Sequence, residues 1–271
     1  MREMLKLGAI GCGNMATAIL KGVKAGMGED CRLFGFDVQE EKMKALEGSI
    51  GMKPLSSAGK VLEEAEFVLL SVKPQNMDEL LSELAASENK DRVYLSIAAG
   101  VTADRIKKAL GFDAKVVPIM PNTPLLLGQG AVAMAKVSPV SQEEFDTARQ
   151  IFQCAGVVRE IPADKMNEII AINGSAPAFL YEFAKGYIQY GAEQGIPYET
   201  CLALFCQTMR GAAEMMEHSG QDIDSLIQMV SSKGGTTIAG LAALRENGLQ
   251  KAVADSCRDC VKRAYELAQG K

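Results

Sequence analysis

The sequence contains a single histidine and no G-x-S-x-G motif of the kind that presents a catalytic serine. His218 lies directly before Ser219-Gly220, a pattern that predicts a helix end, where a solvated histidine is common. A Ser-His-Asp mechanism would have to use this residue as its base and would lack the turn that exposes the nucleophile. The sequence therefore argues against a hydrolase of that type.

Long apolar runs and a positive net charge are also absent. No apolar run reaches the ~18 residues of a membrane span. The first residues, Met1–Leu7, lead into a strand-like run without the apolar region and cleavage site of a signal peptide. The net charge of −5 and the pI near 5.2 disfavour nucleic acid or an anionic membrane as the main partner. We expect a cytoplasmic protein.

The cysteines do not form the pattern of a disulfide framework, because there are seven of them and they are scattered through the chain. Cys257 and Cys260 have the spacing of half a zinc site, but the sequence contains no second pair at that spacing. We interpret them as two thiols one turn apart on a helix, and we predict no metal site.

Short apolar runs alternate with amphipathic segments through the first half of the chain. Strands are expected at Leu5–Ile10, Arg32–Asp37, Phe67–Val72, Val93–Ile97, Lys115–Ile119, Ala131–Ala135 and Val157–Glu160. Helices are expected at Met15–Ala25, Glu40–Leu46, Met77–Ala86, Thr102–Leu110 and Gln142–Phe152. Repeated strand–helix–strand units predict a parallel sheet covered on both faces. The shorter final connections are also compatible with an antiparallel edge.

The pattern changes after Ile161-Pro162. Asp164 is a good N-cap, so a helix is expected to begin there. Apolar residues at helical spacing follow in five segments, at 179–188, 202–216, 223–229, 238–244 and 249–267. We predict no strand after Glu160. The predicted fold class is α/β, with an N-terminal Rossmann-type domain over residues 1–161 and an all-α domain over residues 162–271.

The first expected strand runs into Gly11-Cys12-Gly13-Asn14-Met15-Ala16, a G-x-G-x-x-A motif between a strand and a helix. Gly11 permits the tight turn, Gly13 lets the backbone approach a pyrophosphate, and Ala16 lets the helix pack close to the strand. The pyrophosphate would rest on the helix N-terminus. We therefore predict that these six residues bind a dinucleotide.

Asp37 ends the second expected strand, where an acidic residue accepts hydrogen bonds from an adenosine ribose. A 2′-phosphate about 4 Å from this carboxylate would be repelled by a few kcal/mol, so Asp37 favours NAD. The alternative interpretation is that Asp37 only caps the next helix.

Two further segments end strands at the edge where open α/β sheets bind ligands. Val72-Lys73-Pro74 follows one strand and Ile97-Ala98-Ala99 follows the next, so we predict that both contact the cofactor. Lys73 is suited to a phosphate or a substrate carboxylate, but an exposed lysine is equally compatible with simple solvation.

One turn in the second half is rich in glycine and hydroxyl residues, namely Val230-Ser231-Ser232-Lys233-Gly234-Gly235-Thr236-Thr237-Ile238. Apolar residues at a spacing of three follow it and predict a helix. Free N–H groups at a helix N-terminus suit an anion, but Ser and Thr are also the usual capping residues. The residues alone leave an anion site and a simple helix cap equally open.

Taken together, these motifs resemble those of the pyrroline-5-carboxylate reductase family over nearly the whole chain. The matching segments are Gly11–Ala16, Val72–Pro74, Ala98–Gly100, Met120–Pro124, Gly174–Ala178 and Val230–Thr237, the last being close to the family's signature. The resemblance implies hydride transfer from NADPH or NADH to L-1-pyrroline-5-carboxylate, which gives L-proline in the last step of proline biosynthesis. It also implies that the all-α domain binds substrate and forms dimers, sometimes rings of dimers, whose active sites draw on both subunits.

The resemblance assigns the substrate to the glycine-hydroxyl turn. In the family, backbone N–H groups of this turn hold the substrate carboxylate, and a hydroxyl lies near the ring nitrogen. The substrate-binding residues implied here are Ser232, Gly234, Gly235, Thr236 and Thr237, and Thr237 carries the catalytic hydroxyl. The family commonly uses NADPH, whereas Asp37 predicts substantial use of NADH.

Two other functions remain open from the sequence. A two-domain dehydrogenase of the hydroxyacid type would use a lysine on the interdomain helix as general acid. The segment expected to face the cleft, Asn173–Pro177, contains no lysine, and Lys165 lies at the expected helix start. A dinucleotide-binding protein without turnover is favoured only if the Val230–Thr237 turn is a mere cap.

Overall fold

The structure is a computed structural model that describes residues 4–268. The chain forms two compact units: the first comprises the residues up to Pro177 together with those from Asp259 onward, and the second comprises Ala178–Arg258. In the sequence, the second unit is therefore an insertion between two segments of the first.

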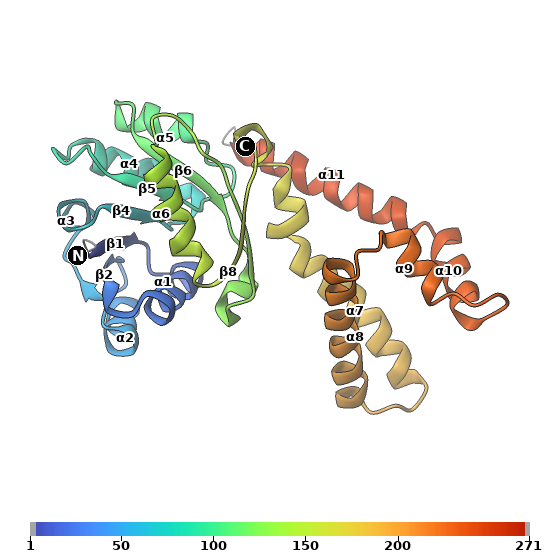
Figure 1. The fold of residues 1–271 in the computed structure, drawn as a ribbon. Coiled ribbons are helices and arrows are strands. Elements are labelled where there is room, and N and C mark those ends of the chain that lie inside the picture. The colour runs from blue at the N-terminus through green and yellow to red at the C-terminus, as the bar shows by residue number, and fades with distance from the viewer. Residues whose placement is uncertain (1–3, 269–271) are drawn as a thin grey trace. The chain divides into compact units, whose positions relative to one another are not determined.

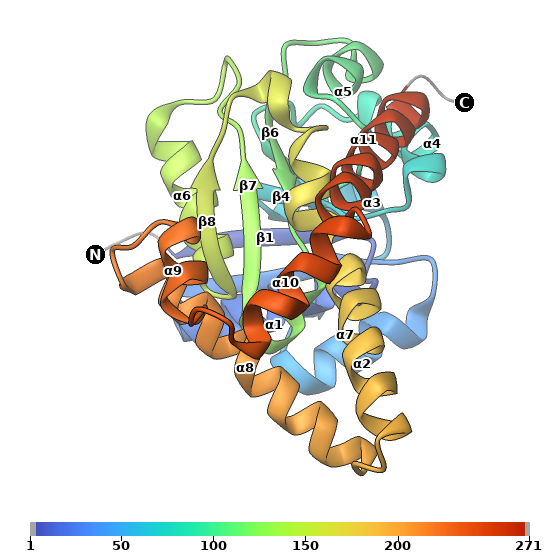
Figure 2. The same ribbon diagram turned by 90° about the vertical axis from the view of Figure 1, so that its right-hand side faces the viewer.

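An eight-stranded sheet forms the centre of the first unit (Figure 1). Its strands are β1 (Leu5–Ile10), β2 (Cys31–Phe36), β3 (Lys53–Pro54), β4 (Phe67–Leu70), β5 (Val93–Ser96), β6 (Lys115–Met120), β7 (Gly130–Met134) and β8 (Gly156–Glu160). Their order is β3-β2-β1-β4-β5-β6-β7-β8, and all neighbours are parallel except β6 and β7. Figure 2 shows β7 and β8 side by side at that edge. The strand order reverses between β1 and β4, which is where open α/β sheets bind ligands.

Helices cover both faces of this sheet, as the sequence predicts. One core packs α1 (Asn14–Met27), α2 (Glu40–Ile50) and α6 (Gln142–Gln153) on one face, and the other packs α3 (Ala58–Glu64), α4 (Met77–Ala85) and α5 (Ala103–Leu110) on the opposite face. Successive side chains of a strand alternate between the faces. In β4, for example, Leu69 belongs to the first core and Val68 to the second.

Side-chain caps begin several helices of the first unit. Ser57 Oγ accepts a hydrogen bond from Lys60 N–H at 3.2 Å at the start of α3. Ser141 and Glu144 form a reciprocal capping box at the start of α6. β3 and α3 are absent from the expected elements because β3 has two residues, while α3 has seven and contains Gly59.

The expected helix start at Asp164 is wrong. Ala163–Lys165 forms a short 3₁₀ turn with Pro162 as its N-cap, and Ile170–Gly174 forms a π-helical turn. The next α-helix begins at Ala176. A capping pattern in the sequence does not predict this arrangement, because it depends on contacts between distant parts of the chain. The Asn173 side chain of the π turn bonds to the carbonyl oxygens of Met120 and Ala131, which lie 53 and 42 residues earlier in the sequence.

The second unit is built from helices that follow one another along the chain. They are α7 (Ala176–Glu193), α8 (Tyr198–His218), α9 (Ile223–Met229), α10 (Thr236–Glu246) and α11 (Leu249–Ala268), of which α7 begins and α11 ends in the first unit. Tyr187 on α7 stacks on Phe205 on α8 with their ring centroids 4.6 Å apart. Within residues 4–268, no strand follows Glu160, and no helix is long and apolar enough to cross a membrane.

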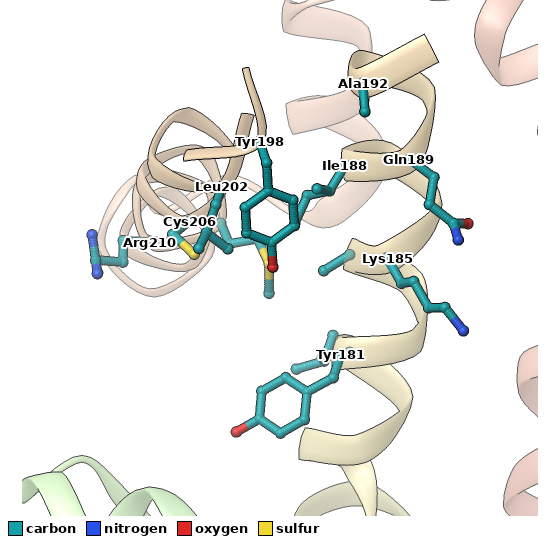
Figure 3. A pocket seen from close by; sticks show the side chains of 12 residues that line it. Tyr181, Lys185, Ile188, Gln189, Ala192, Tyr198, Leu202, Cys206 and Arg210 are labelled. Carbon is teal, nitrogen blue, oxygen red and sulfur yellow. The ribbon is translucent and has the colours of Figure 1, made fainter. Parts of the chain in front are cut away.

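A groove of about 680 Å³ lies between α7 and α8 (Figure 3). Tyr181, Ile188 and Tyr198 point into the space between the two helices, while the charged ends of Lys185 and Arg210 point away from it. The groove is therefore apolar inside and charged at its rim, and such surfaces are typical of protein–protein contacts.

Candidate functional site

The turn between β1 and α1 is shaped by two glycines with different constraints. Gly11 has a φ of +89°, and a Cβ there would lie 2.7 Å from the carbonyl oxygen of Ser71. Only glycine fits this position. Gly13 is the N-cap of α1, and a Cβ there would meet no atom within 4 Å. No side chain caps α1, so its first N–H groups border open space and are available to an anion.

Asp37 is buried and ties this turn to the end of β2. Cys12 N–H donates to Asp37 Oδ2 at 2.7 Å, and Gln39 N–H donates to Oδ1 at 2.8 Å. Gln39, not Asp37, is the N-cap of α2, so the interpretation of Asp37 as a mere cap is wrong. Lys42 Nζ lies 3.7 Å from Asp37 Oδ2 and places a cation beside the carboxylate.

The thiol of Cys12 takes no part in nucleophilic chemistry at neutral pH. Burial raises its pKa to about 12, with a smaller contribution from the charge of Asp37. The thiol therefore stays protonated. The contribution of Cys12 to the turn comes from its backbone N–H, which is bonded to Asp37.

A cavity of about 410 Å³ lies on the β2 side of the turn. The predicted residues that line it are Gly11, Gly13, Asp37, Val72 and Lys73. Lys42, Glu79 and Glu83 also line it, although the sequence did not single them out. Its walls therefore carry charges of both signs.

A second cavity, of about 480 Å³, lies at the carboxyl ends of β4, β5 and β6. The predicted residues that line it are Gly13, Asn14, Met15, Val72, Lys73, Pro74, Ile97, Ala98 and Ala99. Gly13, Ser71, Val72 and Lys73 line both cavities, so the two adjoin at the glycine turn. Cys12 and Ala16 line neither, because both are buried below the turn.

Six residues line the second cavity outside the predicted set, namely Ser71, Met120, Pro121, Ile170, Gly174 and Ser175. The sequence could have indicated Met120 and Pro121, because they lie at the carboxyl end of β6, where open α/β sheets bind ligands. From the sequence we expect Asn173–Pro177 to face the cleft, and Gly174 and Ser175 line this cavity. Ile170 carries no such signal, because its position depends on contacts with the sheet.

The turn predicted to bind substrate connects α9 to α10 in the second unit. Gly234 has a φ of +74°, and Gly235 N–H donates to Ser232 O at 2.9 Å. Gly235 is the N-cap of α10, and no side chain caps this helix. The alternative of an ordinary Ser or Thr cap is therefore wrong, and the first N–H groups of α10, from Thr236 and Thr237 onward, remain available to an anion.

Known proteins match both parts of the chain. A family model described as pyrroline-5-carboxylate reductase dimerisation matches residues 163–267, and one described as NADP oxidoreductase coenzyme F420-dependent matches residues 6–100. The pyrroline-5-carboxylate reductase of Escherichia coli strain K12 is 33% identical over 265 residues, which cover 97% of this chain and 98% of that protein. The chain belongs to the pyrroline-5-carboxylate reductase family.

Solved structures of pyrroline-5-carboxylate reductases have the same fold. The Plasmodium falciparum enzyme, crystallised with NADP bound, is 25% identical with a TM-score of 0.88, and the match covers 98% of this chain and 99% of that one. The Streptococcus pyogenes enzyme is 29% identical with a TM-score of 0.88, covering 97% and 98% of the two chains. The predicted family and fold class, a Rossmann-type domain followed by an all-α dimerisation domain, are confirmed.

Proposed function

We propose that this protein reduces L-1-pyrroline-5-carboxylate to L-proline with a hydride from NAD(P)H, the last step of proline biosynthesis. The observation that carries the proposal is the match to the Escherichia coli reductase over 97% of the chain. Two features support it: the open nucleotide cleft of the first unit and the uncapped glycine turn of the second.

The first unit supplies the cofactor site in this proposal. The open space beside Gly13 and the free N–H groups of α1 fit a pyrophosphate. The β2-side cavity then takes the adenosine, and the cavity at the ends of β4 to β6 takes the nicotinamide. The reduced nicotinamide supplies the hydride when it is bound, and the cleft residues orient it.

The second unit supplies the substrate site. The free N–H groups at the start of α10, with the turn residues Ser232, Gly234, Gly235 and Thr236, hold the substrate carboxylate. The hydroxyl of Thr237 donates a hydrogen bond to, or accepts one from, the ring nitrogen as its bonding changes. A protonated imine is already a good hydride acceptor, so orientation of the two reactants contributes much of the rate.

We expect substantial use of NADH alongside NADPH. The Asp37 carboxylate accepts hydrogen bonds from the ribose hydroxyls and repels a 2′-phosphate. Lys42, 3.7 Å from that carboxylate, offsets part of the repulsion and leaves NADPH usable.

We also propose a homodimer in which residues 1–161 bind most of the nucleotide, with the π turn Ile170–Gly174 against the nicotinamide, and the rest of residues 162–271 bind substrate and form the subunit contact. The apolar groove between α7 and α8 and the matched dimerisation family support this assembly. All seven cysteines are free thiols, which supports a reducing compartment such as the cytoplasm.

The test is the oxidation of NADH and of NADPH with pyrroline-5-carboxylate, followed by absorbance. Thr237→Ala removes one hydrogen bond to the substrate and should lower kcat/KM roughly ten- to a hundredfold without changing cofactor affinity. Thr208→Ala is the matched control, since the Thr208 hydroxyl bonds only within α8, to Leu204 O, and its loss should leave activity unchanged. Absence of oxidation above background with both cofactors would contradict the proposed function.

A dehydrogenase of the hydroxyacid type is the main alternative. Lys165, its candidate general acid, lies in the 3₁₀ turn Ala163–Lys165 and pairs with Asp164 at 3.3 Å. The lining segment of the π turn contains no lysine. Thr237→Ala would leave such a dehydrogenase nearly intact, so the same variant separates the two functions. A protein that binds NADH but gives no turnover with the imine would instead be a non-catalytic dinucleotide-binding protein.

A further inference from the structure

Where β6 ends, two asparagine side chains take the place of main-chain hydrogen bonds between β6 and β7. β6 and β7 run antiparallel with Met120 opposite Ala133, and the same register continued by two residues would set Asn122 opposite Ala131. Asn122 Oδ1 accepts from Ala131 N–H at 2.9 Å. Asn173 Nδ2 donates to Ala131 O at 3.2 Å. Both main-chain polar groups of Ala131 are thus satisfied by side-chain amides.

Asn173 belongs to the π turn Ile170–Gly174 and not to the sheet. Its Nδ2 also donates to Met120 O at 2.7 Å, so a single amide group bonds to both β6 and β7. The two carbonyl acceptors determine the orientation of the amide, because a flipped group would place Oδ1 against both of them.

The amide of Asn173 leaves one of its polar atoms unpaired, so stability alone does not account for its arrangement. The residue is 8% exposed, and its Oδ1 has no hydrogen-bond partner within residues 4–268. An unpaired acceptor in a buried position destabilises the fold and offsets part of what the two donated bonds contribute. Single π-helical turns are rare and are frequent at functional sites, and this one lines the adjoining cavity.

The π turn is one wall of the cavity at the ends of β4 to β6. Ile170, Gly174 and Ser175 line it from the turn, and Met120 lines it from the end of β6. Because Asn173 sits within the turn and bonds to Met120 O, its side chain joins these two sets of lining residues.

We propose that Asn173 is a positioning residue that holds the π turn against β6 and β7 and so sets the width of the nicotinamide cavity. The proposal rests on the nucleotide use proposed above. It concerns only the nicotinamide half of the cofactor, because the β2-side cavity shares no lining residue with the π turn.

The decisive experiment compares the binding of NADH with that of ADP-ribose, which lacks the nicotinamide, by titration calorimetry of the full-length protein. If the wild type prefers the phosphorylated cofactor, NADPH and 2′-phospho-ADP-ribose replace this pair. Asn173→Ala removes both donated bonds and should weaken NADH binding about fivefold while leaving ADP-ribose binding unchanged. Asn173→Asp turns an oxygen toward the two carbonyls and should weaken NADH binding further.

Asn89→Asp is the matched control. Asn89 lies in the connection between α4 and β5, at the amino edge of the sheet and away from both cavities. The same chemical change there should leave both affinities as in the wild type. If Asn173→Asp does not fold, Asn173→Ala still decides the outcome, and a thermal unfolding midpoint well above the assay temperature shows that this variant is folded.

Turnover adds an independent measurement. With cofactor deuterated at the transferred position, Asn173→Ala should lower kcat and raise the primary isotope effect on kcat, because a misplaced nicotinamide slows hydride transfer relative to the other steps.

A lower unfolding midpoint with unchanged isotope effect and unchanged NADH affinity would overturn the proposal, as would equal weakening of NADH and ADP-ribose. A wild type that binds NADH without turnover would contradict only the proposed function, and the binding comparison would still decide the role of Asn173. A wild type that binds neither ligand would overturn both.

Discussion

The two compact units of this reductase differ in how their apolar residues are covered. In the first unit, side chains as large as Tyr94 and Phe145 are almost completely buried between the sheet and its helices. In the second unit, Ile188 and Gly191 are the buried residues among those described, while Tyr181 is 66% exposed. The first unit is thus stabilised by its own chain, whereas the second presents an apolar surface suited to a second copy.

The units nevertheless share one local device. α1 in the first unit and α10 in the second both begin at a glycine, Gly13 and Gly235, without a side-chain cap. By contrast, Ser57, Thr102 and Ser141 cap their helices through a side-chain oxygen. A glycine at this position leaves the first N–H groups free for a ligand, and these two helices are the ones to which the proposed function assigns a phosphate and a carboxylate.

The largest expected effect is at the glycine turn of the first unit. Gly11→Ala would force a side chain into a φ of +89° and against Ser71 O, so we expect the loss of measurable NADH binding and a free energy of unfolding lower by about 1–3 kcal/mol. Gly48→Ala is the control, because a Cβ there meets no atom within 4 Å in α2 and should stabilise the protein by about 0.5–1 kcal/mol. Titration with NADH and thermal unfolding measure both effects. Wild-type binding by Gly11→Ala would show that this turn does not form the nucleotide site.

An effect of intermediate size is expected at the exposed face of the second unit. Leu180 lines the groove between α7 and α8 and is 48% exposed in the single chain. Leu180→Asp should place an unpaired charge in the proposed subunit contact and convert the proposed dimer to a monomer with little activity.

Size-exclusion chromatography with light scattering measures this change, and Leu127→Asp is its control. Leu127 is 83% exposed on the first unit, so the same substitution there should leave the mass unchanged. A dimer that survives Leu180→Asp would mean that the apolar face of the second unit has another role.

The smallest expected effect concerns the choice of cofactor. Asp37→Asn removes the negative charge from the proposed adenosine ribose site and should shift the ratio of kcat/KM for NADPH over NADH by about tenfold toward NADPH. Asp30→Asn, an exposed position before β2, should leave the ratio unchanged. An unchanged ratio in Asp37→Asn would show that this carboxylate serves only to hold the glycine turn through Cys12 N–H.

The sequence predicts the glycine turn and Asp37 of the first unit better than it predicts the other residues that line the two cavities. The Gly11–Ala16 motif and Asp37 are recognisable because their roles depend on short spacings next to a strand end. The sequence does not predict Lys42 or Ile170 as lining residues, because their places in the cavities depend on how helices and turns pack onto the sheet. The hydroxyl-rich turn before α10 shows the same limit: its residues favour a cap and an anion site equally, and the backbone places a glycine at the N-cap.

The sequence by itself determined the family, the alternation of strands and helices and the position of the Gly11–Ala16 turn, because each is recognised from motifs whose own residues lie close together in the chain. Only the tertiary structure decided that Asp37 binds the turn through Cys12, 25 residues away, and that Asn173 bonds to Met120, 53 residues away. Both bonds depend on which main-chain groups the folded sheet leaves without a partner, and local sequence patterns carry no information about such groups.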